Sequence, residues 1–216
     1  MPARSPAATA ATGLIVRTLA LQAVLVVTTV VAARQSDAAI AAHQVAFRLW
    51  TLLALALDAI AIAGQAITGR CLGAGDAAAA RAATNRMIGW GAVYGIIFGL
   101  IVLAARPLLP GLFAAAPPVR ALLLAVLLVV AAQQPVAGVV FVLDGVLIGA
   151  GDQRYLAVAG VLSLAAFLPA AWLVHAQHRG LVALWLAYSL WLLARFVTLV
   201  LRARGSAWLV TGAVRR

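Results

Sequence analysis

The chain contains no lysine and no glutamate, and only 10% of its 216 residues are charged. Soluble domains carry about 25% charged residues, so this composition excludes an ordinary water-soluble globular protein. All 16 basic residues are arginine and the five acidic residues are aspartate, which gives a net charge of +11. No stretch combines dense arginines with polar, solvated flanks, so we expect no nucleic-acid partner. Arginines placed at the edges of a membrane explain the excess better.

Cysteine is almost absent. Cys71 is the single cysteine of the chain, so an intramolecular disulfide is excluded. His175 and His178 lie three residues apart, but no cysteine, glutamate or third histidine adjoins them in the sequence. A metal site needs three or four converging ligands, so we expect no metal here. The sequence favours a protein that is not an enzyme and that has no organic cofactor.

The chain contains many long apolar runs, and 66% of its residues are hydrophobic. A helix needs about 20 apolar residues to cross about 30 Å of hydrocarbon. Six segments reach this length, and they predict an all-α membrane protein, a bundle of six transmembrane helices. The six predicted spans are 14–33, 45–69, 87–105, 119–149, 155–174 and 181–201. Residues 1–13 would form a cytoplasmic N-terminal segment, and residues 202–216 a basic cytoplasmic tail.

The arginines predict the orientation of the bundle. With the N-terminus inside, ten arginines, Arg17 among them, fall on the cytoplasmic side and five on the outer side, and Arg195 lies within the last span. The positive-inside rule therefore favours a multi-pass protein of the cell membrane with both termini in the cytoplasm. We interpret the basic tail, which includes Trp208, as a topological anchor that lies along anionic lipid headgroups.

The second predicted span has one polar face. Gln44, Arg48, Thr51, Asp58 and Gln65 recur at spacings that place them within a stripe about 100° wide on a helix. A span surrounded by lipid would have no such stripe, so this face is expected to meet protein or a wet cavity. Asp58 lies near the middle of the span, where an unpaired charge is most costly.

Two other spans also carry polar residues at helical spacing, among them Gln22 in the first span and Gln133 with Asp144 in the fourth. Mostly apolar walls with a few fixed polar groups are typical of a cavity that accepts a solute. The stripes predict such a cavity between the helices. The glutamines expected to line it are Gln22, Gln44, Gln65 and Gln133.

Asp58 and Asp144 are the candidate binding residues. Desolvation disfavours the charged form of a carboxyl, so such a group can hold a proton or bind a cation in one state and release it in another. Either aspartate has an alternative, structural role. It would then form a hydrogen bond between helices, or a buried ion pair with an arginine such as Arg48 or Arg195.

Glycines mark turns and a packing surface. The sequence Gly-Ala-Gly-Asp occurs at 73–76 and again at 149–152, where glycine can close one helix and aspartate can cap the next.

Residues 76–86 are expected to form a short helix on the membrane surface. Pro135 is expected to kink the fourth span. The glycines at 91, 95 and 99 predict a ridge for close helix packing.

An ordered set of motifs resembles the multidrug and toxic compound extrusion (MATE) family, in its DinF-like branch. These motifs are Ala41-Ala42-His43-Gln44, Leu57-Asp58 with Gln65 downstream, Gly73-Ala74-Gly75-Asp76, and the stretch from Phe141 to Asp152. The resemblance covers nearly the whole chain. It implies one lobe of a twelve-helix protein, in which two six-helix bundles enclose a V-shaped cavity and organic solutes are exchanged for protons or sodium ions.

The resemblance implies a secondary active efflux transporter, an antiporter for drugs, organic solutes or cations, of which this chain is the C-terminal half. Its partners would be the lipid bilayer, a small organic solute, H⁺ or Na⁺ as coupling ion, and a second six-helix half, in trans or as missing N-terminal sequence. Asp58 would bind the cation or a cationic solute, and Asp144 would assist. The coupling carboxylate of the family's first bundle has no counterpart in this chain.

Two alternatives stay open. The first is a lipid-linked precursor flippase of the wider superfamily, which would place more cationic residues in the cavity. The second is a remnant or assembly partner that transports nothing by itself.

Overall fold

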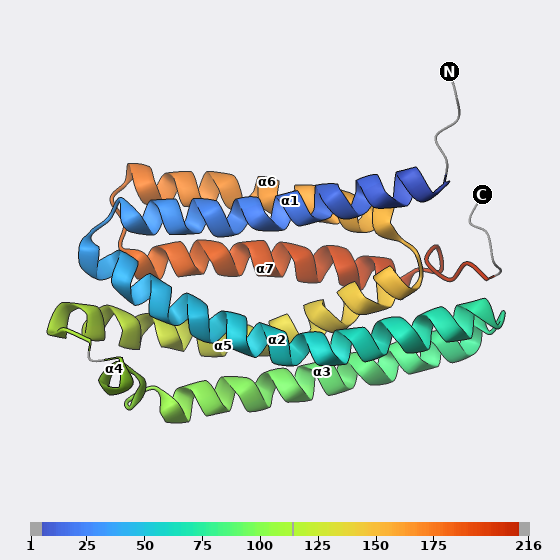
Figure 1. Ribbon diagram of the computed structural model, residues 1–216, viewed down its shortest axis with the longest axis horizontal. Coiled ribbons are helices and arrows are strands. Elements are labelled where there is room, and N and C mark those ends of the chain that lie inside the picture. Colours follow the sequence, from blue (N-terminus) through green and yellow to red (C-terminus); the bar gives the residue numbers. More distant parts are fainter. Residues whose placement is uncertain (1–5, 114, 212–216) are drawn as a thin grey trace, which may run out of the picture.

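The computed structural model describes residues 6–113 and 115–211, with side chains from residue 11 onward. This part of the chain folds into seven helices joined by short turns (Figure 1). The helices are α1 (Pro6–Ala33), α2 (Asp37–Gly73), α3 (Ala77–Ala105), α4 (Leu109–Leu112), α5 (Pro117–Gly149), α6 (Gln153–Ala176) and α7 (Leu181–Arg204). All but α4 include a stretch long and apolar enough to cross a membrane. The predicted fold class, an all-α membrane protein with six spans, is therefore confirmed.

The helices extend beyond the predicted ranges where polar side chains support their ends. Helix α2 begins at Asp37, eight residues before the predicted span, because the Ser36 hydroxyl accepts a hydrogen bond from the Ala39 N–H at 3.1 Å. Residues 77–86 do not form a separate surface helix, and that prediction was wrong. They are the first turns of α3, since the alanine-rich segment has high helix propensity and nothing interrupts it before the apolar run.

Helix α5 lies at the centre of the bundle and is the most buried of the six spans. It packs against α2, α3 and α7, while α1 packs mainly against α6 (Figure 1). Pro135 lies within α5 and does not end it. Both ends of the described chain lie at the same end of the bundle, which we call the terminal end; α2 and α5 also end there.

Glycines let α3 approach α5 backbone to backbone, as predicted. A Cβ atom added at Gly91 would lie 2.6 Å from the carbonyl oxygen of Gly138, and one added at Gly99 would lie 2.7 Å from that of Ala131. Gly95, between them, faces the Gln134 carbonyl still more closely. Each of these positions therefore requires the absence of a side chain.

The two Gly-Ala-Gly-Asp turns have matching backbones but different aspartate contacts. Gly75 and Gly151 adopt φ angles of 82° and 71°, in the left-handed region that favours glycine. Asp76 caps α3 by accepting the Ala79 N–H at 2.8 Å. Asp152 instead accepts a hydrogen bond from Arg202 Nε at 2.7 Å, which ties the start of α6 to the end of α7.

The segment after α7 folds back onto the bundle. Trp208 is fully buried, and its indole N–H donates to the Ala203 carbonyl at 3.1 Å. Arg81 of α3 donates to the carbonyls of Ala203, Arg204 and Gly205 and lies over the Trp208 ring. Trp208 thus packs against protein, whereas a headgroup anchor was predicted. Two of the predicted tail arginines, Arg215 and Arg216, lie outside the described residues.

Replacing Arg81 with methionine is expected to loosen this segment. The variant keeps the aliphatic stem but removes the donors to three carbonyls, and hydrogen bonds from a charged group contribute about 1.5 kcal/mol or more. Amide hydrogen exchange of residues 205–210 should then become about tenfold faster. Arg86→Met, at an exposed position of the same helix, is the matched control. Equal exchange in both variants would contradict a role for Arg81 in holding the segment.

Candidate functional site

A cavity of about 340 Å³ lies between α1, α2, α5 and α7. Its walls are mostly apolar and aromatic, while four charged side chains, two arginines and two aspartates, face it from different helices. The residues that line the cavity include Arg17, Leu21, Trp50, Asp58, Gln65, Phe141, Asp144, Tyr188, Trp191 and Arg195. This combination of apolar walls with a few convergent charges is the usual form of a small-molecule site.

One wall of the cavity is an aromatic cluster contributed by α2 and α7. The ring centroid of Tyr188 lies 5.4 Å from that of Trp50, in an edge-to-face arrangement, and 4.9 Å from that of Trp191. Tyr188 and Trp191 are three residues apart and therefore share one face of α7. The cluster gives the cavity a rigid apolar surface next to its charged groups.

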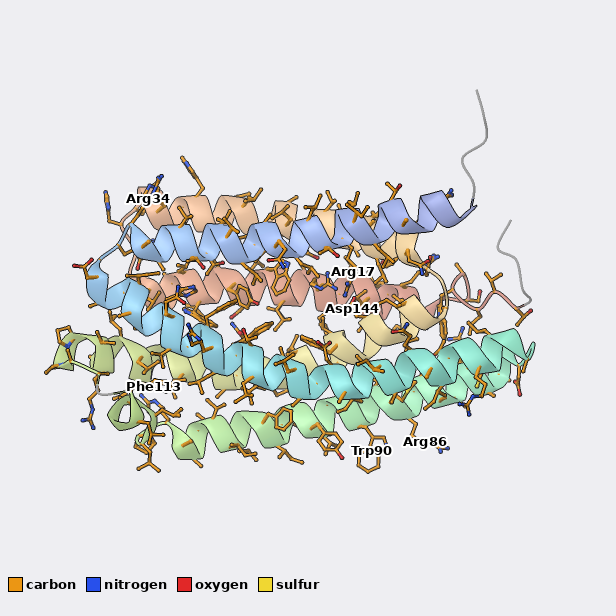
Figure 2. The ribbon with its side chains drawn as sticks, in the orientation of Figure 1. Arg17, Arg34, Arg86, Trp90, Phe113 and Asp144 are labelled. Carbon is orange, nitrogen blue, oxygen red and sulfur yellow. The ribbon has the colours of Figure 1, made fainter. Side chains whose placement is uncertain are left out.

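Asp144 of α5 forms ion pairs with two arginines. Arg195 of α7 donates from Nη2 to both carboxylate oxygens, at 2.6 and 2.5 Å. Arg17 of α1 approaches the same carboxylate, with its Nη2 atom 3.2 Å from Oδ2. Figure 2 shows Arg17 and Asp144 side by side between their helices. The three side chains thus connect α1, α5 and α7 around one negative charge.

This triad is nearly shielded from solvent on the α7 side. Arg195 is 1% exposed, and its guanidinium lies 5.8 Å from the centre of the Trp191 ring. Two of the buried guanidinium nitrogens, Arg17 Nε and Arg195 Nη1, have no hydrogen-bond partner among the described residues. The triad therefore holds two positive charges against one negative charge and has N–H groups left over.

Asp58 has a different environment. It projects from α2 into the same cavity but is exposed, and no arginine of the described chain lies within 4 Å of its carboxylate. Gln65, two turns further along α2, also lines the cavity and is exposed. The cavity therefore has a paired, buried carboxylate on α5 and an unpaired, accessible one on α2.

The structure brings together three of the predicted site residues, namely Asp58, Asp144 and Gln65, and it places the other glutamines elsewhere. Gln22 is exposed outside the cavity, because it follows Arg17 by five residues and so points about 140° away from it around α1. Gln44 is also exposed outside the cavity, since it precedes Asp58 by 14 residues, or about 21 Å of helix.

Gln133 is buried and faces α7 rather than the cavity. Its amide donates to Ser189 Oγ at 2.7 Å and to the Trp185 carbonyl at 3.3 Å. It lines a second, smaller cavity of about 310 Å³ between α5 and α7. Helical spacing placed Gln133 on the same face as Asp144 only if the kink expected at Pro135 is ignored, and the two residues lie on opposite sides of this proline.

The arginines of the cavity were not recognised from the sequence as site residues. Arg195 was noted within the last span and named as a possible partner of an aspartate, and this structural alternative is the one that the structure shows for Asp144. Arg48, the other named partner, is exposed on α2. Arg17 was assigned to the membrane edge, although it interrupts an apolar span, which was the available signal.

His175, in the last turn of α6, and His178, which follows that helix, line a third pocket with Arg34 and Arg179, away from the cavity. Within the described residues, no group of three or more histidine, cysteine, aspartate or glutamate side chains is arranged to hold a metal ion.

Sequence comparisons place this bundle among known proteins. Residues 14–173 match the MatE family. Protein DETOXIFICATION 43 of Arabidopsis thaliana is 30% identical over 189 residues, which are 88% of this chain and 36% of that protein. Protein DETOXIFICATION 45, chloroplastic, of the same plant is 30% identical over 182 residues, covering 84% of this chain and 32% of that protein. The chain thus spans about a third of the length of these relatives.

Solved structures show the same fold. A MATE protein crystallised in complex with MaD5 aligns with a TM-score of 0.75 at 20% identity, over 94% of this chain and 46% of that one. A MOP superfamily transporter from Pyrococcus furiosus, described as having a binding pocket of reverse polarity that suggests a different function, aligns with a TM-score of 0.77 at 18% identity, also over 94% and 46%. Since the family match covers most of the chain, and the bundle has the fold of one half of these transporters, the chain belongs to the MatE family.

Proposed function

We propose that this chain is one six-helix bundle of a secondary active transporter, which exports a small organic solute across a cell membrane in exchange for H⁺ or Na⁺. The observation that carries the proposal is the cavity itself. Four charged side chains line a space between helices of membrane-spanning length, where charges are costly and are retained mainly for function. Membership of the family, and relatives named for detoxification and multidrug resistance, support the same conclusion.

A second bundle is expected to cover the polar face of α2. Gln44, Arg48, Thr51, Asp58 and Gln65 are all exposed along this face, and lipid is a poor solvent for them. A second bundle, in trans or in a longer polypeptide, would enclose this face and close the cavity. Rocking of one bundle against the other would then expose the cavity to each side of the membrane in turn. Matched structures about twice as long as this chain support this arrangement.

In this proposal the two aspartates have different roles. Asp58 is accessible and unpaired in the described chain, so it binds the coupling ion or a positively charged group of the solute. Asp144 keeps the two arginines in place through its ion pairs and does not bind the coupling ion. The terminal end faces the cytoplasm, as the distribution of arginines favours.

A flippase for a lipid-linked precursor is the second candidate, because such a carrier is expected to have cationic residues in its cavity and Arg17 and Arg195 lie there. The cavity volume of about 340 Å³ suits a small solute better than a polyprenyl-linked sugar. Transport of a soluble solute by the chain and its partner bundle would decide against this candidate.

Replacing Asp58 with asparagine is expected to reduce transport by about tenfold or more, because the amide cannot form a charged contact with a cation. The measurement is efflux of a fluorescent cationic dye from everted vesicles that contain this chain and a first-bundle partner. Asp37→Asn, at an exposed position at the start of the same helix, is the matched control and should transport normally. Absence of transport of both the dye and the amino acid phenylalanine, from folded and inserted protein, would overturn the proposed function.

A further inference from the structure

The charges in the cavity are separated into two regions. On the side of α1, α5 and α7, Arg17 and Arg195 share the single carboxylate of Asp144, which leaves one positive charge in excess. On the side of α2, Asp58 supplies a negative charge with no arginine of the described chain within 4 Å. The sum is neutral when both aspartates are ionised. Arg17 and Asp144 act on Asp58 electrostatically, but no ion pair within 4 Å joins Asp58 to an arginine of the described chain.

The positive region has hydrogen-bond donors ready for an anion. Arg17 Nε and Arg195 Nη1 are buried and have no partner in the described part of the chain. Buried N–H groups of this kind are nearly always satisfied, and a planar guanidinium matches the two oxygens of a carboxylate or a similar oxyanion. Arg195 is 1% exposed whereas the Arg17 side chain is 18% exposed, so the part of this positive region that a solute reaches first belongs to Arg17.

Neither a simple cation nor a simple anion satisfies both regions. An organic cation bound at Asp58 leaves the excess positive charge of the triad uncompensated, and an organic anion bound at the arginines leaves Asp58 unpaired. A solute that carries both charges satisfies both regions at once. The apolar walls between them, formed by Leu21, Phe141 and Trp191 among others, would hold its hydrocarbon body.

We infer that the cavity binds a small organic zwitterion, whose oxyanion contacts Arg17 and Arg195 and whose ammonium group contacts Asp58. This inference rests on the proposed function, because it names the chemical class of the transported solute. A cavity of about 340 Å³ lies at the small end of the range for ligand sites, which suits a solute the size of an amino acid with one ring.

Three probes that share one body test the inference. Phenylalanine carries both charges, phenethylamine carries only the ammonium group, and 3-phenylpropionate carries only the carboxylate. Equilibrium binding of each to the purified chain, in nanodiscs with its partner bundle, is the measurement. Phenylalanine should bind about tenfold or more tightly than either analogue, since each analogue leaves one charged region without its partner.

Two variants test which charge of the solute contacts Arg17 and which contacts Asp58. Arg17→Gln should remove the advantage of phenylalanine over phenethylamine, and Asp58→Asn should remove its advantage over 3-phenylpropionate. Arg17→Gln leaves the Asp144–Arg195 pair intact, and Arg17→Lys, which keeps the charge, should retain part of the preference. Arg86→Gln, at an exposed position on α3 away from the cavity, should bind all three probes as the unchanged chain does.

Two outcomes would overturn the inference. In the first, phenethylamine binds as tightly as phenylalanine to the unchanged chain. In the second, phenylalanine does not bind at millimolar concentration to folded protein. Efflux of the cationic dye and of labelled phenylalanine, measured on the same preparation, separates the two proposals: efflux without a preference for the zwitterion rejects only the inferred solute class, whereas absence of efflux of both compounds rejects transport itself.

Discussion

Replacing Asp144 with alanine is expected to destabilise the bundle by about 3–5 kcal/mol, because it leaves two guanidinium groups inside the protein without a counter-charge. The cost falls mainly on Arg195, which is 1% exposed and cannot turn toward solvent. Thermal unfolding of purified protein measures the effect.

A double variant and a control show whether the unpaired charge or the lost side-chain volume causes this loss of stability. Replacing Asp144 with leucine and Arg195 with methionine together should recover the part of the loss that comes from Arg195, because removal of a buried pair costs far less than removal of one partner. Arg17 still lacks its counter-charge in this variant, but its side chain is 18% exposed. Asp76→Asn is the control, since asparagine caps a helix about as well as aspartate does. If the free energy of unfolding of Asp144→Ala lay within about 1 kcal/mol of that of the unchanged chain, the triad would have no structural role.

The second large effect is expected at Gly95, where alanine should destabilise the protein by about 3 kcal/mol. The added methyl group would meet the backbone of α5 at Gln134 and Pro135, and no side-chain rotation relieves a contact with backbone. To make room, α3 would have to move away from α5 along the whole ridge. Thermal unfolding again measures the change.

Gly89→Ala is the matched control, because it lies on the same helix and nothing lies within 4 Å of the added carbon. Alanine favours helix over glycine by about 1 kcal/mol, so this variant should be neutral or slightly more stable. Equal stability of the two alanine variants would mean that α3 and α5 are not held at the distance that the structure shows.

The spans and the glycine ridge could be predicted from the sequence because both depend on local composition. The number of apolar residues determines whether a helix can cross a membrane, and a spacing of four places Gly91, Gly95 and Gly99 on one face. The position of Asp58 on a polar face of α2 could be predicted for the same reason.

The composition of the cavity could not be predicted in this way. The contact between Asp144 and Arg195 joins residues 51 positions apart on two helices, and helical periodicity gives no information on how helices face each other. Arg17 was counted only among the cytoplasmic arginines, because an arginine near a helix end usually lies at the membrane surface, and its contact with Asp144 was therefore not predicted. In the structure it points inward and reaches Asp144.

The glycine contacts also determine which parts of the bundle can move. Gly91 and Gly138 join α3 to α5, while Gly145 and Gly149 of α5 meet the α2 backbone at Ala61 and Gln65. These three helices therefore form a rigid slab, with little room for sliding. The cavity lies between this slab and α1 and α7, where long side chains meet and can rearrange. Within this bundle, a shape change that follows solute binding is thus expected between the slab and the pair α1 and α7, with the slab moving as one unit.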